Sequence, residues 1–304
     1  MYKVLIADQI SKEGLELLRS NPKLEVIEKT AITPEELTAE IGEYHALVVR
    51  SRSKVTAEQI ANAHNMKLIV RGGVGTDNID KKAATEKGIK VMNTPKASSV
   101  SVAELVLGMM LSGVRDLTDA TESMKAGKWE KKTFKGKELY GKTLGILGVG
   151  NIGKEIATRS MAFGMKVLAF DPYAKEVPAG VEMTDLNKIL QEADIISVNC
   201  PKTDETKGMI NKSNITQLKK GVGIINCSRG GIIEEAALIE ALDQGHVSFV
   251  GLDVFEKEPP DNTHPIAQKA HVTLTPHIGA QTVEGQNRVS AEVAEVINNF
   301  FNQL

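Results

Sequence analysis

The sequence predicts an α/β protein built from two doubly wound domains, each with a parallel β-sheet. Short β-rich runs alternate with helical runs along nearly the whole chain, and such alternation indicates a parallel sheet with helices on both faces. The predicted strands are continuous apolar runs, which is typical of buried parallel strands. The length of 304 residues corresponds to two domains at about 150 residues each.

The first part of the chain carries the first alternating pattern. Helices are expected near residues 11–19, 34–42, 56–63 and 79–87. The strands that separate them are predicted at Lys3–Ala7, Leu24–Ile27, Ala46–Val49, Lys67–Val70 and Ile89–Met92.

A different kind of segment follows from Val100 to Val114. It is apolar on nearly every face, and Glu104 is its only acid. A helix that is apolar all round is buried. The sequence leaves open whether it lies between domains or at a subunit interface.

The alternation then starts again and ends in a long helix. Residues 282–304 form a helical pattern with an apolar face that includes Val289, Val293, Val296, Ile297 and Phe300. The strands of this part are predicted at Thr143–Leu147, Lys166–Phe170, Ile195–Asn199, Gly223–Cys227, Phe249–Asp253 and Val272–Thr275.

Composition excludes several classes of protein. Lys and Arg number 37 against 39 Asp and Glu, and a nucleic-acid-binding protein would show a strong basic excess. No run approaches the ~20 apolar residues of a membrane span, and the start of the chain reads as a strand rather than a secretory signal. Two cysteines, Cys200 and Cys227, provide neither a disulfide framework nor a metal site and fit a reducing cytoplasm.

A glycine-rich turn predicts a dinucleotide site. The segment Gly148–Gly153 has the GxGxxG pattern, follows the strand Thr143–Leu147 and opens a helix. Gly148 permits the tight turn, Gly150 allows the backbone to approach a pyrophosphate, and Gly153 lets helix and strand pack closely. The start of the helix adds a partial positive charge for the phosphates.

Asp171 completes this pattern at the end of the next strand, 23 residues after Gly148. An acid at about this distance accepts hydrogen bonds from the adenosine ribose. It would repel a 2′-phosphate, so NAD is favoured over NADP. The alternative is a strand–turn–helix that binds no ligand.

Three polar residues, Arg229, Glu258 and His277, follow predicted strands at the end where open α/β sheets bind ligands. Hydride transfer to a 2-oxo acid needs a cation for the carboxylate, an acid for the developing alkoxide and a carboxylate that orients this acid. Arg, His and Glu can fill these roles. Residue types alone also permit structural roles for all three. Cys227 reads as a core residue, and the other histidines read as structural.

These motifs together resemble the D-2-hydroxyacid dehydrogenase family over essentially the whole chain. The resemblance rests on Gly148–Gly153 with Asp171, on the stretches 227–231 and 252–259, and on residues 275–280. It implies that His277 is the acid/base, Glu258 its partner and Arg229 the substrate-binding cation. It further implies an NAD site lined by Gly148, Gly150, Asn151, Ile152, Gly153, Asp171, Thr203, Cys227 and Asp253.

The resemblance also implies how the domains are arranged along the chain. A Rossmann NAD-binding domain over residues 97–281 would be inserted into a flavodoxin-like substrate-binding domain made of residues 1–96 and 282–304. The chain would lack the C-terminal regulatory domain of many relatives, so we expect no inhibition by serine through that route.

A second glycine-rich turn, Arg71–Asn78, lacks the GxGxxG spacing and suits a small anion such as a carboxylate. In the family, residues matching Val74 and Gly75 hold the substrate carboxylate. Arg50 and Arg52 follow the strand Ala46–Val49, and with Arg71 they would supply cations for a second anion, for which phosphate fits. Solvated surface charges are the alternative.

The substrate implied is therefore a phosphorylated 2-hydroxy or 2-oxo acid, as in the phosphoglycerate-oxidising branch of the family. The apolar helix at 100–114 predicts a homodimer through the Rossmann domain, and residues 129–132 resemble a segment that lends basic residues to the neighbouring subunit. Two alternatives remain. One is a hydroxypyruvate or glyoxylate reductase, and the other is an NAD-sensing protein like the corepressors that share this fold.

Overall fold

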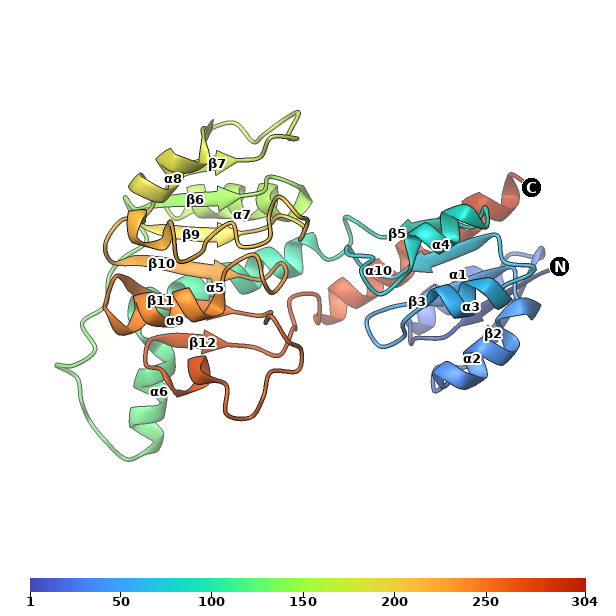
Figure 1. Cartoon of the computed structure of the whole chain (residues 1–304), viewed down its shortest axis with the longest axis horizontal. Helices are drawn as coiled ribbons and strands as arrows, with labels where there is room; N and C mark the ends of the chain where they lie inside the picture. The colour runs from blue at the N-terminus through green and yellow to red at the C-terminus, as the bar shows by residue number, and fades with distance from the viewer. The chain divides into compact units, whose positions relative to one another are not determined.

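The computed structural model describes all 304 residues, which form two compact units (Figure 1). Unit 1 contains Met1–Ser98 and Ala280–Leu304, and unit 2 contains Ser99–Gly279. Unit 1 is thus assembled from both ends of the sequence, while unit 2 is continuous. No helix in either unit combines the length and apolar character that crossing a membrane requires.

Unit 1 contains a five-stranded parallel sheet in the order β2-β1-β3-β4-β5. This is the doubly wound order of flavodoxin-like folds. Val4 pairs with Val26 on one side and with Ala46 on the other. The strands are β1 (Tyr2–Ile6), β2 (Leu24–Glu28), β3 (Ala46–Val49), β4 (Leu68–Arg71) and β5 (Lys90–Asn93).

Helices cover both faces of this sheet, as two separate apolar clusters show. On one face Ile6 and Val48 pack against Val293 and Ile297 of the last helix. On the other face the strands pack against α2, α3 and α4. The helices are α1 (Lys12–Arg19), α2 (Pro34–Glu40), α3 (Ala57–Asn62), α4 (Lys81–Glu86) and α10 (Val283–Asn302).

Helices α1 and α10 of unit 1 approach each other closely at Gly14. A Cβ at this position would lie 2.7 Å from Cβ of Ser290. The same serine accepts a hydrogen bond from the backbone N–H of Ser11, the N-cap of α1, at 2.8 Å. The two ends of the chain are therefore joined by both apolar and polar contacts.

Unit 2 contains a seven-stranded parallel sheet in the order β12-β11-β10-β9-β6-β7-β8. From β8 to β11 this is the Rossmann order 3-2-1-4-5-6, with one further strand at the edge. The strands are β6 (Thr143–Leu147), β7 (Lys166–Phe170), β8 (Val181–Met183), β9 (Ile195–Val198), β10 (Val222–Asn226), β11 (Val247–Leu252) and β12 (Val272–Leu274).

Helices on both faces of the unit 2 sheet explain the apolar run predicted at 100–114. This run is part of α5, which packs with α7 on one face of the sheet. The Phe249 ring of β11 packs so closely against α5 that a Cβ at Gly113 would lie 2.0 Å from it. Helices α8 and α9 cover the other face. The unit 2 helices are α5 (Ser99–Arg115), α6 (Leu117–Lys125), α7 (Asn151–Ala162), α8 (Leu186–Glu192) and α9 (Glu235–Asp243).

The predicted fold class, two doubly wound parallel α/β sheets, is confirmed. The sequence analysis missed β8, which has only three residues and an exposed, partly charged face. An edge strand of this kind lacks the apolar run by which buried strands are recognised.

His45 should make the stability of unit 1 depend on pH. Its Nδ1 accepts a hydrogen bond from the Lys3 backbone N–H at 3.0 Å. Burial lowers the pKa of His45, and the positive charges of Lys67, the N-terminus and Lys3 lower it further. Stability from this group is complete above the unfolded-state pKa of about 6.5. It is lost as the pH falls from there towards the folded-state pKa.

We expect His45→Asn, which keeps an acceptor near the Nδ1 position but does not titrate, to flatten the pH dependence of unfolding. Urea titrations between pH 5 and pH 7.5 would measure it. Parallel curves for the variant and the natural protein across this range would contradict the prediction.

Candidate active site

The glycine-rich turn after β6 is shaped by two close backbone approaches. Gly148 has φ +95°, and a Cβ on it would lie 2.8 Å from the backbone N of Cys200. A Cβ on Gly153 would lie 2.3 Å from the carbonyl oxygen of Gly148. Gly150 differs, because nothing lies within 4 Å of its added Cβ. The turn is therefore packed against neighbouring backbone at Gly148 and Gly153. It is open at Gly150, directly before the start of α7.

Asp171 lies beside this turn at the end of β7. Its Oδ2 accepts a hydrogen bond from the Val149 N–H at 2.8 Å, and its Oδ1 accepts one from the Tyr173 N–H at 2.8 Å. Each oxygen keeps lone pairs for another donor. Burial raises the pKa of the Cys200 thiol to about 11, and the charge of Asp171 adds to this effect. The residues predicted to bind the ribose and pyrophosphate of NAD thus lie side by side.

Two other residues predicted at the cofactor site lie at the edges of this region. Ile152 is half-buried in the first turn of α7. Thr203 is exposed in the loop after β9, where its N–H donates to the hydroxyl of Thr206 at 2.8 Å.

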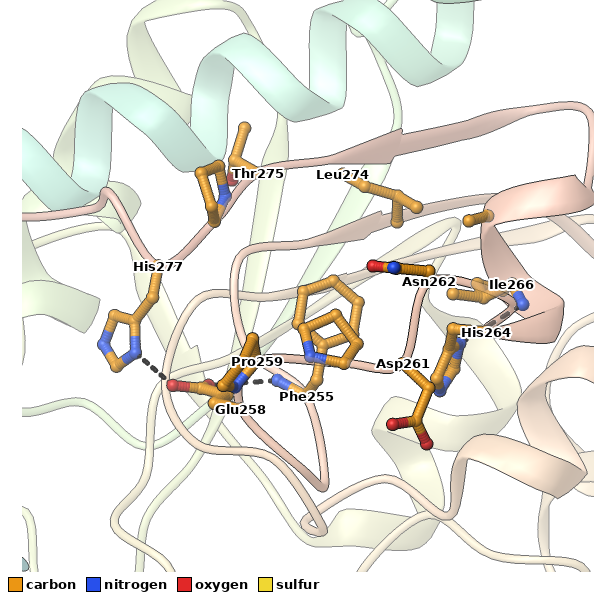
Figure 2. A pocket seen from close by; sticks show the side chains of 13 residues that line it. Phe255, Glu258, Pro259, Asp261, Asn262, His264, Ile266, Leu274, Thr275 and His277 are labelled. Carbon is orange, nitrogen blue, oxygen red and sulfur yellow. Dashed lines mark hydrogen bonds and ion pairs between the residues drawn. The ribbon is translucent and has the colours of Figure 1, made fainter.

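His277 and Glu258 form a hydrogen-bonded pair (Figure 2). Nδ1 of His277 lies 2.7 Å from Oε2 of Glu258. The other carboxylate oxygen, Oε1, accepts from the Phe255 N–H at 3.1 Å. With Nδ1 donating to the carboxylate, Nε2 is the ring nitrogen available to another molecule. His277 has φ +54°, a left-handed conformation that is uncommon for a residue with a side chain.

The segment that carries His277 is held by Asp253, whose side chain is buried at the end of β11. Oδ1 of Asp253 accepts from the Thr275 hydroxyl at 2.5 Å and from the Ile278 N–H at 2.7 Å, and Oδ2 accepts from the Gly279 N–H at 2.7 Å. Donors on both sides of His277 therefore converge on one carboxylate. The predicted contact of Asp253 with the cofactor remains a prediction.

Arg229 follows β10, the neighbour of β11 in the sheet. Its guanidinium donates to the Ser228 carbonyl at 2.6 Å, and its own carbonyl accepts from the Asn226 amide at 2.9 Å. A Cβ on the next residue, Gly230, would lie 1.8 Å from the carbonyl oxygen of Phe255. The chain at Arg229 is therefore packed directly on the segment that precedes Glu258.

Cys227, the residue directly after β10, is buried in an unreactive form. Burial, with a smaller effect from the charge of Asp253, raises the pKa of its thiol far above the usual range. Its Sγ lies 3.6 Å from Sδ of Met109. A thiol in this setting does not act as a nucleophile.

A cavity of about 530 Å³ lies beside the His277–Glu258 pair (Figure 2). Phe255, Pro259 and Leu274 are among the apolar residues of its wall, and His264 is among the polar ones. The sequence analysis did not select His264, since nothing in its immediate sequence distinguishes it from a surface histidine.

In unit 1 the structure distinguishes between the two arginines that follow β3. Each guanidinium nitrogen of Arg52 donates a hydrogen bond within the protein. Its Nε donates to Oδ1 of Asp8 at 3.0 Å, and its two terminal nitrogens donate to the carbonyls of Ala7 at 2.6 Å and Ile32 at 3.3 Å. Arg52 therefore anchors its own loop.

Arg50 and Arg71 lie instead against the glycine-rich turn after β4. A Cβ on Gly72 would lie 3.2 Å from Cγ of Arg50, and a Cβ on Gly73 would lie 1.5 Å from a terminal nitrogen of Arg71. Arg50 donates to the Gln9 carbonyl at 3.2 Å, while its Nε is buried without a partner. Burial lowers the pKa of Arg50, against the charge of Asp8, which raises it. The absence of side chains at Gly72 and Gly73 thus leaves space for the side chains of both arginines at one turn.

Asp8 is a residue that the sequence analysis missed. It accepts hydrogen bonds from the backbone of Arg50 at 2.5 Å and from the Ser53 hydroxyl at 2.7 Å, in addition to Arg52. Its position directly after the first strand was the available signal, because strand ends are where polar side chains collect in such sheets.

Comparisons with known proteins identify the family to which this chain belongs. Residues 107–279 match the family described as D-isomer specific 2-hydroxyacid dehydrogenase, NAD binding domain. A hydroxypyruvate reductase from Thermotoga maritima is 49% identical, over 97% of this chain and 97% of the relative. A D-3-phosphoglycerate dehydrogenase from Archaeoglobus fulgidus is 46% identical over 98% of this chain, which spans 57% of that relative's length.

Solved structures share the whole fold. A glyoxylate reductase from Paecilomyes thermophila has a TM-score of 0.89 at 31% identity, covering 98% of this chain and 94% of its own. A D-lactate dehydrogenase from Aquifex aeolicus, solved with NAD and lactic acid, has a TM-score of 0.84 at 31% identity, covering 99% and 96%. The chain therefore belongs to the D-isomer specific 2-hydroxyacid dehydrogenases, with its NAD-binding domain in unit 2.

Proposed function

We propose that this chain catalyses the NAD-linked oxidation of D-3-phosphoglycerate to 3-phosphohydroxypyruvate, and the reverse reaction, as the first step of serine biosynthesis. The observation that carries the choice of substrate is the placement of Arg50 and Arg71 at the glycine-rich turn of unit 1. With Arg229 assigned to the carboxylate, these two cations suit a second anion, and guanidinium groups match the geometry of phosphate. D-3-phosphoglycerate dehydrogenases 45–46% identical to this chain support the same substrate.

The residues of unit 2 have the chemistry that this reaction requires. In the direction of oxidation, Nε2 of His277 takes the proton of the C2 hydroxyl. Glu258 holds the ring in position through Nδ1 and stabilises the positive charge that the ring acquires. Arg229 binds the carboxylate and polarises the C2 oxygen. NAD, when bound, accepts the hydride that leaves C2.

We assign the cofactor to the glycine turn of unit 2. Gly148 and Gly153 shape this turn and the open side at Gly150 admits a pyrophosphate, while both oxygens of Asp171 retain lone pairs for ribose hydroxyls. Unit 1 would be the substrate-binding domain, with Val74 and Gly75 at the carboxylate. The remaining proposed cofactor contacts are Asn151, Ile152, Thr203, Cys227 and Asp253.

Reduction of hydroxypyruvate is the second candidate function. The Thermotoga maritima relative named for it is 49% identical over nearly the full length of both chains. This reaction would use the same three residues of unit 2 but would not need a phosphate site. An NAD-sensing binding protein is a third alternative, and turnover of any 2-hydroxy acid would exclude it.

A homodimer through unit 2 is part of the proposal. Trp129 is 80% exposed and Met124 is 55% exposed, and together with Phe134 they line a cavity. Apolar side chains gathered on a surface in this way mark an interaction site. A second copy would cover them, and residues 129–132 would then lie near the partner's site. The two free thiols, Cys200 and Cys227, fit the proposed cytoplasmic location.

Substitution of His277 by Ala should reduce kcat for the preferred 2-hydroxy acid by ~10²- to 10⁴-fold, which is the usual contribution of a positioned acid/base. Glu258→Gln should also lower kcat, while KM for NAD changes little in both variants. Steady-state kinetics would test this. Near-normal turnover in His277→Ala would contradict the assigned role.

Substitution of Arg50 or Arg71 by Met should raise KM for the phosphorylated substrate by ~10- to 100-fold, because a charged hydrogen bond contributes about 1.5–3 kcal/mol. KM for hydroxypyruvate should change far less. Arg52→Met is the matched control and should lower thermal stability without this selectivity. Equal losses on both substrates in the Arg50 and Arg71 variants would refute the phosphate assignment and favour the second candidate.

The assembly can be measured directly. Sedimentation equilibrium should give about twice the chain mass of 32.9 kDa, and Trp129→Glu should shift the protein towards monomer because it places a charge in the proposed interface. A natural protein that sediments at the mass of one chain at micromolar concentration would rule out the stable dimer.

A further inference from the structure

A second histidine, His264, supports the segment that carries Glu258. Its Nε2 lies 2.9 Å from Oε2 of Glu235, and its Nδ1 accepts from the Ile266 N–H at 3.3 Å. Because Nδ1 is the acceptor, the ring hydrogen is on Nε2 and is donated to Glu235. The two side chains are only 18% and 15% exposed, so this contact is largely shielded from water.

Glu235 connects His264 to the backbone next to the active site. Glu235 is the first residue of α9, and its Oε1 accepts from the Glu256 N–H at 2.6 Å. In return, Oε1 of Glu256 accepts from the Glu235 N–H at 3.0 Å. The start of α9 and the segment after β11 are therefore joined by a reciprocal pair of hydrogen bonds, with His264 bound to the remaining carboxylate oxygen.

Phe255 is the contact between this network and Glu258. Its ring lies edge-on to the ring of His264, with centroids 5.9 Å apart and planes at 66°. Its N–H donates to Oε1 of Glu258, the carboxylate that holds His277. In Figure 2 the side chains of His264, Phe255, Glu258 and His277 surround one cavity. Between His264 and His277 lie the ring of Phe255, its backbone N–H and the carboxylate of Glu258.

The peptide bond between Phe255 and Glu256 also contacts the backbone next to Arg229. The backbone of Gly230 approaches the carbonyl of Phe255 so closely that any Cβ at Gly230 would lie 1.8 Å from it and 2.6 Å from the N of Glu256. A displacement of the peptide between Phe255 and Glu256 would therefore reach Glu258 and Arg229 together.

We propose that His264 and Glu235 are positioning residues that fix the peptide between Phe255 and Glu256 and thereby set the orientation of Glu258 towards His277. Neither residue touches the reacting atoms. The inference rests on the proposed catalytic roles of Glu258 and His277. It goes beyond them by placing part of the active-site geometry on helix α9.

Two substitutions of His264 separate its hydrogen bonds. Gln can donate an amide N–H near the position of Nε2, whereas Asn offers an acceptor near Nδ1 but is too short to reach Glu235. We expect His264→Asn to lower kcat by about tenfold or more, since a misplacement of ~1 Å can cost ~100-fold. His264→Gln should recover much of this loss, and KM for NAD should stay within about twofold of the natural value in both.

A double-mutant cycle with Glu258→Gln tests whether His264 acts through Glu258. If it does, adding His264→Asn to Glu258→Gln lowers kcat no further, and both single variants alter the pH profile of kcat in the same direction. The matched control is His246→Asn. Nε2 of His246 lies 2.9 Å from the Leu218 carbonyl oxygen elsewhere in unit 2, and this substitution removes that hydrogen bond. It should leave kcat unchanged.

The outcomes separate this inference from the proposed function. Normal kcat in Glu258→Gln would overturn the catalytic role and the inference with it. Two other outcomes would overturn the inference but leave the proposed function intact. One is a low kcat in Glu258→Gln together with a normal kcat in His264→Asn, and the other is a double variant in which the two losses of kcat multiply. If His264→Asn is too unstable to purify, Glu235→Ala, which removes the carboxylate that His264 contacts, enters the cycle in its place.

Discussion

The parallel direction of the strands determines where every candidate functional residue of this protein can lie. In a parallel sheet all carboxyl ends meet at one edge, and a residue that follows one strand is a neighbour of the residues that follow the next. Arg229, Glu258 and His277 follow β10, β11 and β12, which are adjacent in the unit 2 sheet. Three residues separated by up to 48 positions in the sequence are brought to one edge by this constraint alone.

The exact positions of the loops that carry these residues then depend on one buried carboxylate in each unit. Asp253 is 1% exposed and Asp8 is 3% exposed, and each follows a strand and gathers donors from a neighbouring loop. Asp253 holds the residues on both sides of His277, and Asp8 holds the loop of Arg50 and Arg52. A carboxylate can be buried in this way because several hydrogen bonds replace those it would make with water. Both loops are thereby fixed before any ligand arrives.

Local signals in the sequence were sufficient for the fold and for the main motifs. Apolar strands, the GxGxxG turn and the polar residues at strand ends each depend on neighbouring positions, so they can be read without coordinates. The edge strand β8 lacks such a signal. The distinction between Arg50 and Arg52 depends on which guanidinium meets Asp8, about 40 positions away, and therefore required the structure.

His264 illustrates the same limit at the active site. The sequence analysis interpreted it as structural, and its contacts are with Glu235, 29 residues away, and with the ring of Phe255. Contacts of this kind arise only when α9 packs beside the segment after β11. No spacing rule within one segment could have revealed them.

The construction of unit 1 from two separate parts of the chain has a consequence for synthesis on the ribosome. The unit 1 cluster that contains Val4 and Val48 also contains Val293, Ile297 and Phe301 of α10. These residues are translated only after the whole of unit 2. Unit 2 has all its strands and helices before α10 is made, whereas one apolar face of the first 98 residues is covered until then only by α1. Such exposed faces are where aggregation begins. The order of translation thus makes the first strands of the protein the last to gain their full cover.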